Sequence, residues 1–413
     1  MKARTLKHVI SNFRRRVALE PDELDAWFIE REGSPRRRMK IALGLATKQK
    51  VLLIGHRGSG KSTELRKLAE EMENEFELVG FDVLDITGRT NIEYEDLMLS
   101  ISTQVTRHCI QKNLVRQPLA GPVQQKLEEL RDWWMQVVAG TGFRPASAEV
   151  EIGLQIETLL GQVEIGVQQS SQTREAIKDQ INRQMPDLIR RLNWVIEQAE
   201  AGNRKKLMLV VEGMDKINQD CAMQIFRDQS PTITAPNATM IFTFPIALRH
   251  TDDYNSIRLK FDHVWFLPNI SVFHSDGTTL HDEGVEASRN LVLSRMEENL
   301  IEGAALDLLV RNYGGIPVRM VYLVQLAATF ALARDERAAS ITTADVEDAI
   351  KELRREMRTP LTRKDLEVLS ERHRDRTLTN DEIEQRLLYN GSLIDYSNGE
   401  TWCDAHPALW SLL

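Results

Sequence analysis

The chain has 413 residues, of which 42% are hydrophobic and 28% charged, and its formal net charge is −8. This length predicts two or three domains with ordinary cores, and the negative charge disfavours a protein that binds nucleic acid over its whole surface. We expect a cytoplasmic protein for three reasons. No apolar run reaches the roughly 18 residues of a membrane helix, and the basic start lacks the apolar stretch of a secretory signal. Cys109, Cys221 and Cys403 form no CxxC pair.

The N-terminal segment, residues 1–30, is basic, and the excess of positive charge continues to residue 40. Residues 1–40 contain 11 Lys/Arg and 6 Asp/Glu, with arginine runs at 14–16 and 36–38. Such runs are usually solvated surface, and contact with a polyanion is the alternative.

A buried strand and a phosphate-binding loop come next. Val51–Ile54 is an apolar run of strand length, and the residues after it fit the P-loop pattern GxxxxGK[ST]. The glycines let successive backbone amides point at phosphate oxygens, Lys61 brings charge to the β- and γ-phosphates, and the Ser62 hydroxyl can ligate Mg²⁺. A helix that begins near Lys61 offers its N–H groups to the same anion. The sequence therefore predicts a site for ATP and Mg²⁺ that consists of Gly55, His56, Arg57, Gly58, Ser59, Gly60, Lys61, Ser62 and Thr63.

The interval after the P-loop is longer than the fold requires. Residues 77–84 predict a second strand, but the βαβ steps of a parallel sheet leave a surplus, which we interpret as an insertion at about 114–184. Its pattern predicts an amphipathic helix over 126–135, a β-hairpin from the alternation over 150–157 and 163–167, and a returning helix over 171–201. We expect the hairpin to contact a neighbouring subunit or a partner. Membrane insertion is disfavoured, because each arm is shorter than the roughly 9–11 residues of a spanning strand.

An acidic strand end follows the insertion. Leu207–Val211 is another buried-strand run, and it ends in Glu212. Ligands lie beyond the carboxyl ends of parallel strands, so the Glu212 carboxylate is expected to face the Mg²⁺ that the P-loop serine holds. Two more predicted strands, 239–245 and 263–267, bring the total to five. Thr243 should leave the sheet beside Glu212, within reach of the γ-phosphate or the attacking water.

The last part of the chain predicts a winged helix. Two helices, 361–372 and 380–389, precede a hairpin over 393–403, in which Asn398-Gly399 is the favoured dipeptide for a type I′ turn. Residues 361–413 contain 6 Lys/Arg and 10 Asp/Glu, whereas phosphate contacts need positive charge. This charge favours a protein-contacting module over a DNA-binding one.

The chain resembles the AAA+ ATPases in the order of its motifs, which are a P-loop, a long interval, an acidic strand end, a polar strand end and a helical tail. Within that family it is most similar to the replication-initiator (origin-recognition-like) and STAND branches. Residues 313–319 resemble the sensor 2 segment of the lid domain, and 341–350 resemble the last lid helix, with Thr343 as its N-cap. The resemblance implies that Phe28 packs over adenine and that Arg319 reaches the γ-phosphate.

Two residues depart from the pattern of that family. The first acid of the strand end is Glu212 instead of aspartate, and Gly213 occupies the position where a catalytic glutamate is usual. Asp215 matches the second acid of STAND-like proteins, and we expect it to orient the attacking water. Arg258, just before the last core strand, is a candidate arginine finger toward a neighbouring subunit, with an ordinary surface arginine as the alternative. Hydrolysis is still expected, and a slow rate would suit a switch rather than a motor.

The predicted fold class is α/β: a five-stranded parallel P-loop NTPase sheet with a helical lid and a C-terminal winged helix. The predicted domains are the basic segment 1–30, the ATPase core 31–268, the lid 269–358 and the winged helix 359–413. We expect an ATP-hydrolysing, homo-oligomeric switch that controls a separate effector protein, and the resemblance suggests bacterial phage defence as the setting. The alternatives are a DNA-associated ATP-dependent loader or transposition-type regulator, and a nucleotide-bound scaffold without turnover.

Overall fold

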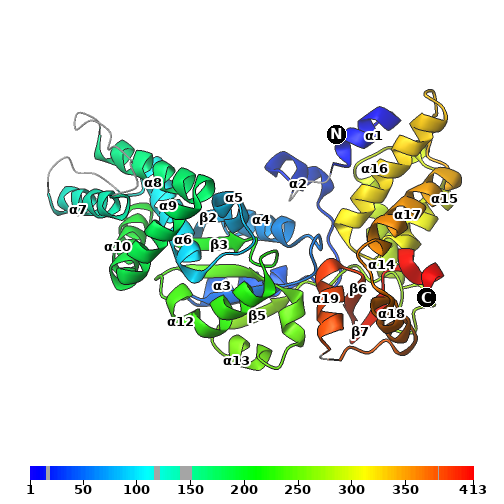
Figure 1. The fold of residues 1–413 in the computed structure, drawn as a ribbon. Coiled ribbons are helices and arrows are strands. Elements are labelled where there is room, and N and C mark those ends of the chain that lie inside the picture. Colours follow the sequence, from blue (N-terminus) through cyan, green and yellow to red (C-terminus); the bar gives the residue numbers. More distant parts are fainter. Residues whose placement is uncertain (15–18, 116–120, 140–150, 380) are drawn as a thin grey trace.

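A central parallel sheet organises the structure, a computed structural model that describes residues 1–14, 19–115, 121–139, 151–379 and 381–413 (Figure 1). The strands are β1 (Lys50–Ile54), β2 (Phe76–Asp82), β3 (Lys206–Glu212), β4 (Thr239–Phe244) and β5 (His263–Phe266). Their order is β2-β3-β4-β1-β5, and every neighbouring pair is parallel. The predicted five-stranded parallel sheet is therefore confirmed.

Alternate residues of the interior strand β1 face two different layers of the core, as the two-residue period of a strand requires. Leu52 and Ile54 belong to one hydrophobic cluster, and Val51 and Leu53 to another. The helices of the N-terminal part and the core are α1 (Leu6–Asn12), α2 (Pro21–Trp27), α3 (Arg36–Leu45), α4 (Lys61–Glu71), α5 (Val83–Thr87), α6 (Tyr94–Gln111), α11 (Gln219–Met223), η1 (Gln224–Asp228), α12 (Ser230–Ile233), η2 (Ile246–His250) and α13 (Tyr254–Arg258).

The insertion is helical throughout its described part, and Figure 1 shows it gathered at one end of the molecule. It consists of α7 (Pro122–Val137), α8 (Ile152–Gln169), α9 (Ser171–Arg183) and α10 (Met185–Asn203). The amphipathic helix expected over 126–135 lies within α7. The single helix expected over 171–201 is divided at Gln184, because Pro186 in the first turn of α10 starts a new helix there.

The predicted β-hairpin over 150–167 is wrong: its described residues form helix α8. Ile156, Leu160, Val163 and Val167 are buried at helical spacing. Leu154 and Ile165, which belong to the predicted alternation, are 53% and 50% exposed on the outer side of this helix. Val150 lies in 140–150, outside the described residues. Apolar residues occupy so many positions of this segment that it fits both the two-residue period of a strand and the 3.6-residue period of a helix. Packing against the neighbouring helices selects the helix.

The lid follows the sheet and includes the start of the chain. Its helices are α14 (Asp282–Leu293), η3 (Glu298–Leu300), α15 (Gly303–Asn312), α16 (Pro317–Arg334) and α17 (Thr343–Arg358). Helix α1 packs beside α16 (Figure 1), and the Ala3 N–H donates to the Arg295 carbonyl at 2.9 Å. Helix α17 is capped by Thr342, which forms a capping box with Asp345, and not by Thr343 as predicted.

The C-terminal module has the predicted winged-helix order. It consists of α18 (Arg363–Asp375), α19 (Glu382–Asn390), the antiparallel hairpin β6 (Leu393–Asn398) and β7 (Glu400–Ala405), and η4 (Pro407–Leu412). Gly399 adopts a φ of 92°, but Asn398 is not in the left-handed region, so the turn is not the predicted type I′. Among the described helices, none combines the length and apolar character needed to cross a bilayer.

Candidate nucleotide-binding site

The P-loop connects β1 to α4 with a backbone that only glycine adopts easily. Gly58 has a φ of 78° and Gly60 a φ of 95°, and Gly60 is the residue from which α4 starts. A Cβ atom on Gly58 would also lie 2.1 Å from Val318 Cγ1 of α16. Helix α4 thus begins directly after the glycine-rich turn, the order in which a helix N-terminus and loop amides bind phosphate.

Lys61, the P-loop lysine, is held by a carboxylate and two carbonyl groups. Its Nζ lies 2.8 Å from Asp215 Oδ2, and it donates to the carbonyls of Gly55 at 2.8 Å and His56 at 2.9 Å. Both charged side chains are 5% exposed. Burial raises the pKa of Asp215, but the adjacent Lys61 ammonium and the nearby Lys216 charge outweigh burial, so the pKa is lowered and the carboxylate stays ionised.

The predicted metal ligands lie side by side. The Ser62 hydroxyl at the start of α4 donates to the carboxylate of Glu212 at the end of β3. Burial raises the pKa of Glu212, although Ser62 and Arg66 oppose this effect. A hydroxyl and a carboxylate oxygen are the hard ligands that Mg²⁺ prefers, so these two residues fit the ion that the P-loop implies.

The structure explains why glycine follows Glu212. Gly213 has a φ of 83°, and a Cβ atom there would lie 2.1 Å from Asp82 Oδ1. Asp82 is in register with Glu212 on the adjacent strand β2, and its Oδ2 accepts from Lys216 Nζ at 2.7 Å. A side chain at position 213 would be strained and would displace the Asp82 carboxylate, so we look for a water-orienting acid elsewhere. Asp82 is a site residue that the sequence analysis missed, and its place at the end of β2 was the available signal.

A cavity of about 490 Å³ joins these groups to the lid and the C-terminal module. Ten predicted site residues line it, and they come from the P-loop, the strand ends and the lid: His56, Arg57, Gly58, Gly60, Lys61, Ser62, Glu212, Asp215, Thr243 and Arg319. The helix α19 closes one side through Tyr389. Arg258 is exposed at the end of α13 and does not line this cavity.

A second, more apolar cavity of about 130 Å³ lies on the other side of the loop. Phe28 and Trp27 border it together with Gly60 and Thr63 of the P-loop. The structure thus places Phe28 beside the phosphate loop. Arg295 also lines the cavity and lies over the Trp27 ring at 5.3 Å, and burial lowers its pKa to about 10.

Two predicted P-loop residues direct their side chains toward the C-terminal module. The buried His56 Nε2 accepts a hydrogen bond from the Asp395 N–H of β6 at 2.9 Å. The Arg57 guanidinium lies 3.8 Å from the centroid of the Tyr389 ring and donates to the Lys216 carbonyl at 2.8 Å. The His56 ring is therefore engaged by the C-terminal module, whereas the exposed Arg57 side chain also borders the cavity. Tyr389 gave no sequence signal, because its proximity depends on how two distant parts pack.

No protein-family model matches the chain, and no curated protein matches it. Solved structures do match. They include RuvB of Thermotoga maritima, with 13% identity over 97% of this chain and 98% of that chain and a TM-score of 0.40. A Walker-type ATPase of Pyrococcus abyssi is 12% identical over 97% of this chain and 99% of that chain, with a TM-score of 0.45. Orc1 of Aeropyrum pernix, solved in complex with DNA, is 12% identical over 95% of this chain and 93% of that chain, with a TM-score of 0.40.

All three likenesses are distant. Identities and TM-scores this low carry no argument about activity. The function proposed below therefore rests on the geometry of the site.

Proposed function

We propose that the chain binds ATP with Mg²⁺, hydrolyses it slowly and acts as a molecular switch. The observation that carries the proposal is the cavity at the carboxyl edge of the sheet, where Lys61, Ser62, Glu212, Asp215 and Thr243 meet. A lysine and a helix N-terminus suit a polyphosphate, and the apolar cavity beside them suits a base.

The contact between Lys61 and Asp215 supplies a mechanism for switching. A bound triphosphate would attract Lys61 away from Asp215, since the β- and γ-phosphates carry more negative charge than one carboxylate. The released Asp215 carboxylate could then accept a proton from the attacking water, beside the hydroxyl of Thr243. Ser62 and Glu212 would hold Mg²⁺, whose charge neutralises the phosphates, and Arg319 would reach the γ-phosphate from the lid.

The site assignment is tested by the variant Lys61→Ala. We expect ATP affinity to fall by at least about tenfold in an equilibrium titration, since a buried charge contact to phosphate is lost. Lys67→Ala, on the outer side of the same helix α4, is the matched control and should bind like the wild type. Circular dichroism establishes that both variants are folded, and equal affinity in all three proteins would refute the assignment.

We also propose that nucleotide controls assembly of the chain with copies of itself. Arg258 is exposed at the end of α13, and its neighbour Leu259 is 78% exposed. An exposed arginine next to an exposed leucine supports a contact in which Arg258 acts as a finger in the site of another copy. Control of a separate effector protein, with phage defence as the setting, rests on the family resemblance alone.

The DNA-associated loader is the weaker proposal. Of the arginine run 36–38, Arg36 is buried in ion pairs with Glu30, Glu64 and Glu71, so it is not available to a polyanion. The C-terminal module combines an excess of acidic residues with a contact to the nucleotide site. Salt-dependent binding to duplex DNA in a fluorescence anisotropy titration would favour the loader over the switch.

A further inference from the structure

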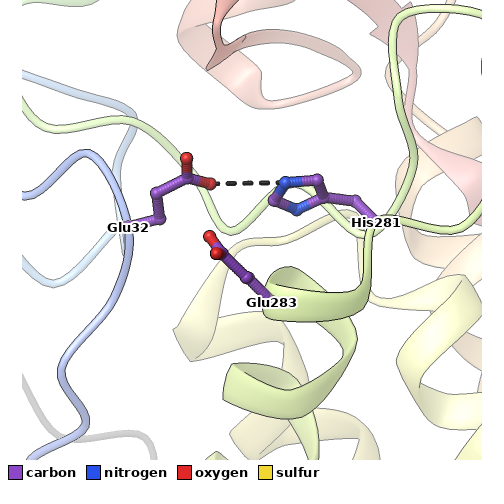
Figure 2. A group of neighbouring side chains, drawn as sticks. All are labelled: Glu32, His281 and Glu283. Atoms are coloured by element: carbon purple, nitrogen blue, oxygen red, sulfur yellow. Dashed lines mark ion pairs between the residues drawn. The ribbon is translucent and has the colours of Figure 1, made fainter.

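Three potential metal ligands lie close together, as Figure 2 shows. None of the three borders either of the two cavities described above. Glu32 lies in the segment between α2 and α3, His281 caps the N-terminus of α14, and Glu283 lies in the first turn of that helix. Their ligand atoms all lie within 4.8 Å of one another, and His281 Nε2 is 3.4 Å from Glu32 Oε2. Two carboxylates and one imidazole thus converge from two segments that are about 250 residues apart in the chain.

The other nitrogen of the imidazole is already oriented by the backbone. His281 Nδ1 lies 3.2 Å from the Ser271 carbonyl oxygen and 3.3 Å from the Gly284 nitrogen. In the arrangement that caps α14, Nδ1 accepts from the Gly284 N–H. A metal ion on Nε2 requires the other tautomer, in which Nδ1 gives up this cap and donates its proton to the Ser271 carbonyl, so that the lone pair of Nε2 is free for the ion. Histidines that ligate metals usually donate their second N–H in this way, which fixes the ring and its tautomer.

A small cavity beside the three ligands supplies an independent observation. Its volume is about 20 Å³, which suffices for one ion or one water molecule, and Glu32, His281 and Glu283 all border it. Asn269 and Ser271 border the same cavity and are 4% and 6% exposed. Among the described residues, neither Asn269 Oδ1 nor Ser271 Oγ has a hydrogen-bond partner. Buried oxygens without partners are costly, so a ligand in this cavity would satisfy them.

We propose that Glu32, His281 and Glu283 bind one divalent first-row transition-metal ion, with Zn²⁺ as the best match. Two carboxylates favour a divalent cation, and the imidazole nitrogen favours Zn²⁺ over Mg²⁺ or Ca²⁺, which prefer oxygen alone. The ion would join the segment after α2 to the lid helix α14. Ser397 and Asn398 of the C-terminal hairpin also border the cavity, so the site lies where three parts of the structure meet.

The test is an isothermal titration of ZnCl₂ into tag-free, EDTA-treated and dialysed full-length protein without nucleotide. We expect one saturable site in the wild type, and an affinity at least about tenfold lower in His281→Gln and in Glu283→Gln. His8→Gln removes an exposed histidine on α1 and is the matched control, which should bind like the wild type. Co²⁺ should give a ligand-field absorption band in the wild type that His281→Gln abolishes.

Circular dichroism and thermal melts without metal report whether each variant is folded. If His281→Gln is unfolded because α14 loses its cap, Glu283→Gln decides the question, since Glu283 is exposed and caps nothing. Absence of a saturable site in the wild type would overturn the proposal, as would equal Zn²⁺ affinity in the wild type and Glu283→Gln. Either result would leave His281 and Glu32 as an ion pair and would not affect the proposed ATP site.

Discussion

Acidification should weaken the attachment of the C-terminal module to the P-loop through His56. The side chain is buried, and its Nε2 must be unprotonated to accept from the Asp395 N–H. Burial lowers the pKa of His56 from 6.5 to about 4, although the nearby Asp395 carboxylate opposes this effect. The folded state therefore holds a neutral imidazole at pH values where the unfolded chain already binds a proton.

The sign and size of the effect follow from the two pKa values. Between pH 6.5 and 4 the unfolded state binds the extra proton, so this contribution to stability is complete above pH 6.5 and is lost as the pH falls toward 4. The full loss is about 3 kcal/mol at 1.36 kcal/mol for each pKa unit, and about 2 kcal/mol of it occurs between pH 7.5 and pH 5.

The assay is urea unfolding at pH 7.5, 6 and 5 for the wild type and His56→Gln. The glutamine amide oxygen can still accept from Asp395 but does not titrate, so the variant should lose about 2 kcal/mol less stability on acidification. Burial also lowers the pKa of His406, to about 3, and that effect is common to both proteins. The exposed His8→Gln serves as the control and should follow the wild type. Equal losses in the wild type and His56→Gln would refute the reasoning.

Three further predictions concern turnover, the backbone and assembly. Asp215→Asn should still bind Mg·ATP but release phosphate about 100-fold more slowly, and wild-type turnover in this variant would assign the base elsewhere. Glu212→Gln should lose the Mg²⁺ dependence of nucleotide affinity. Gly213→Ala should lower the free energy of unfolding by about 1–3 kcal/mol, because position 213 has a φ of 83° and the Asp82 carboxylate lies close to it. The control is Gly161→Ala in α8, where no atom lies within 4 Å of the new Cβ, and this variant should not be destabilised. Arg258→Ala should retain ATP binding but lose an ATP-dependent increase in mass in light scattering, and an unchanged increase would exclude it as the finger.

The features that could be predicted from the sequence are those that local pattern determines. The P-loop is contiguous, and apolar runs such as Val51–Ile54 of β1 identify central strands because both of their faces are buried. Glu212 and Thr243 were found because the carboxyl ends of parallel strands meet at one edge of the sheet. Position in the sheet was therefore sufficient to place both side chains at the cavity.

The features that could not be predicted depend on packing between distant segments. The apolar residues of 150–167 satisfy the periods of both strand and helix, and contacts with neighbouring helices select the helix. The contact of Tyr389 with Arg57 exists only because α19 lies against the P-loop. The proximity of Glu32 to His281 likewise depends on how the lid packs against the segment before α3.

The loop after β3 connects the phosphate site to the C-terminal module through consecutive residues. Asp215 pairs with Lys61, and the carbonyl of the next residue, Lys216, accepts from both Arg57 and the Tyr389 hydroxyl. Moving Lys61 onto a phosphate would leave the buried Asp215 carboxylate without its counter-charge, and that state is costly unless the loop rearranges. Because Lys216 is bonded to Asp215 along the chain, any such rearrangement acts on the contact with α19. We therefore expect the nucleotide state and the position of the C-terminal module to be coupled, and by linkage a partner that displaces the module would change ATP affinity by the same factor.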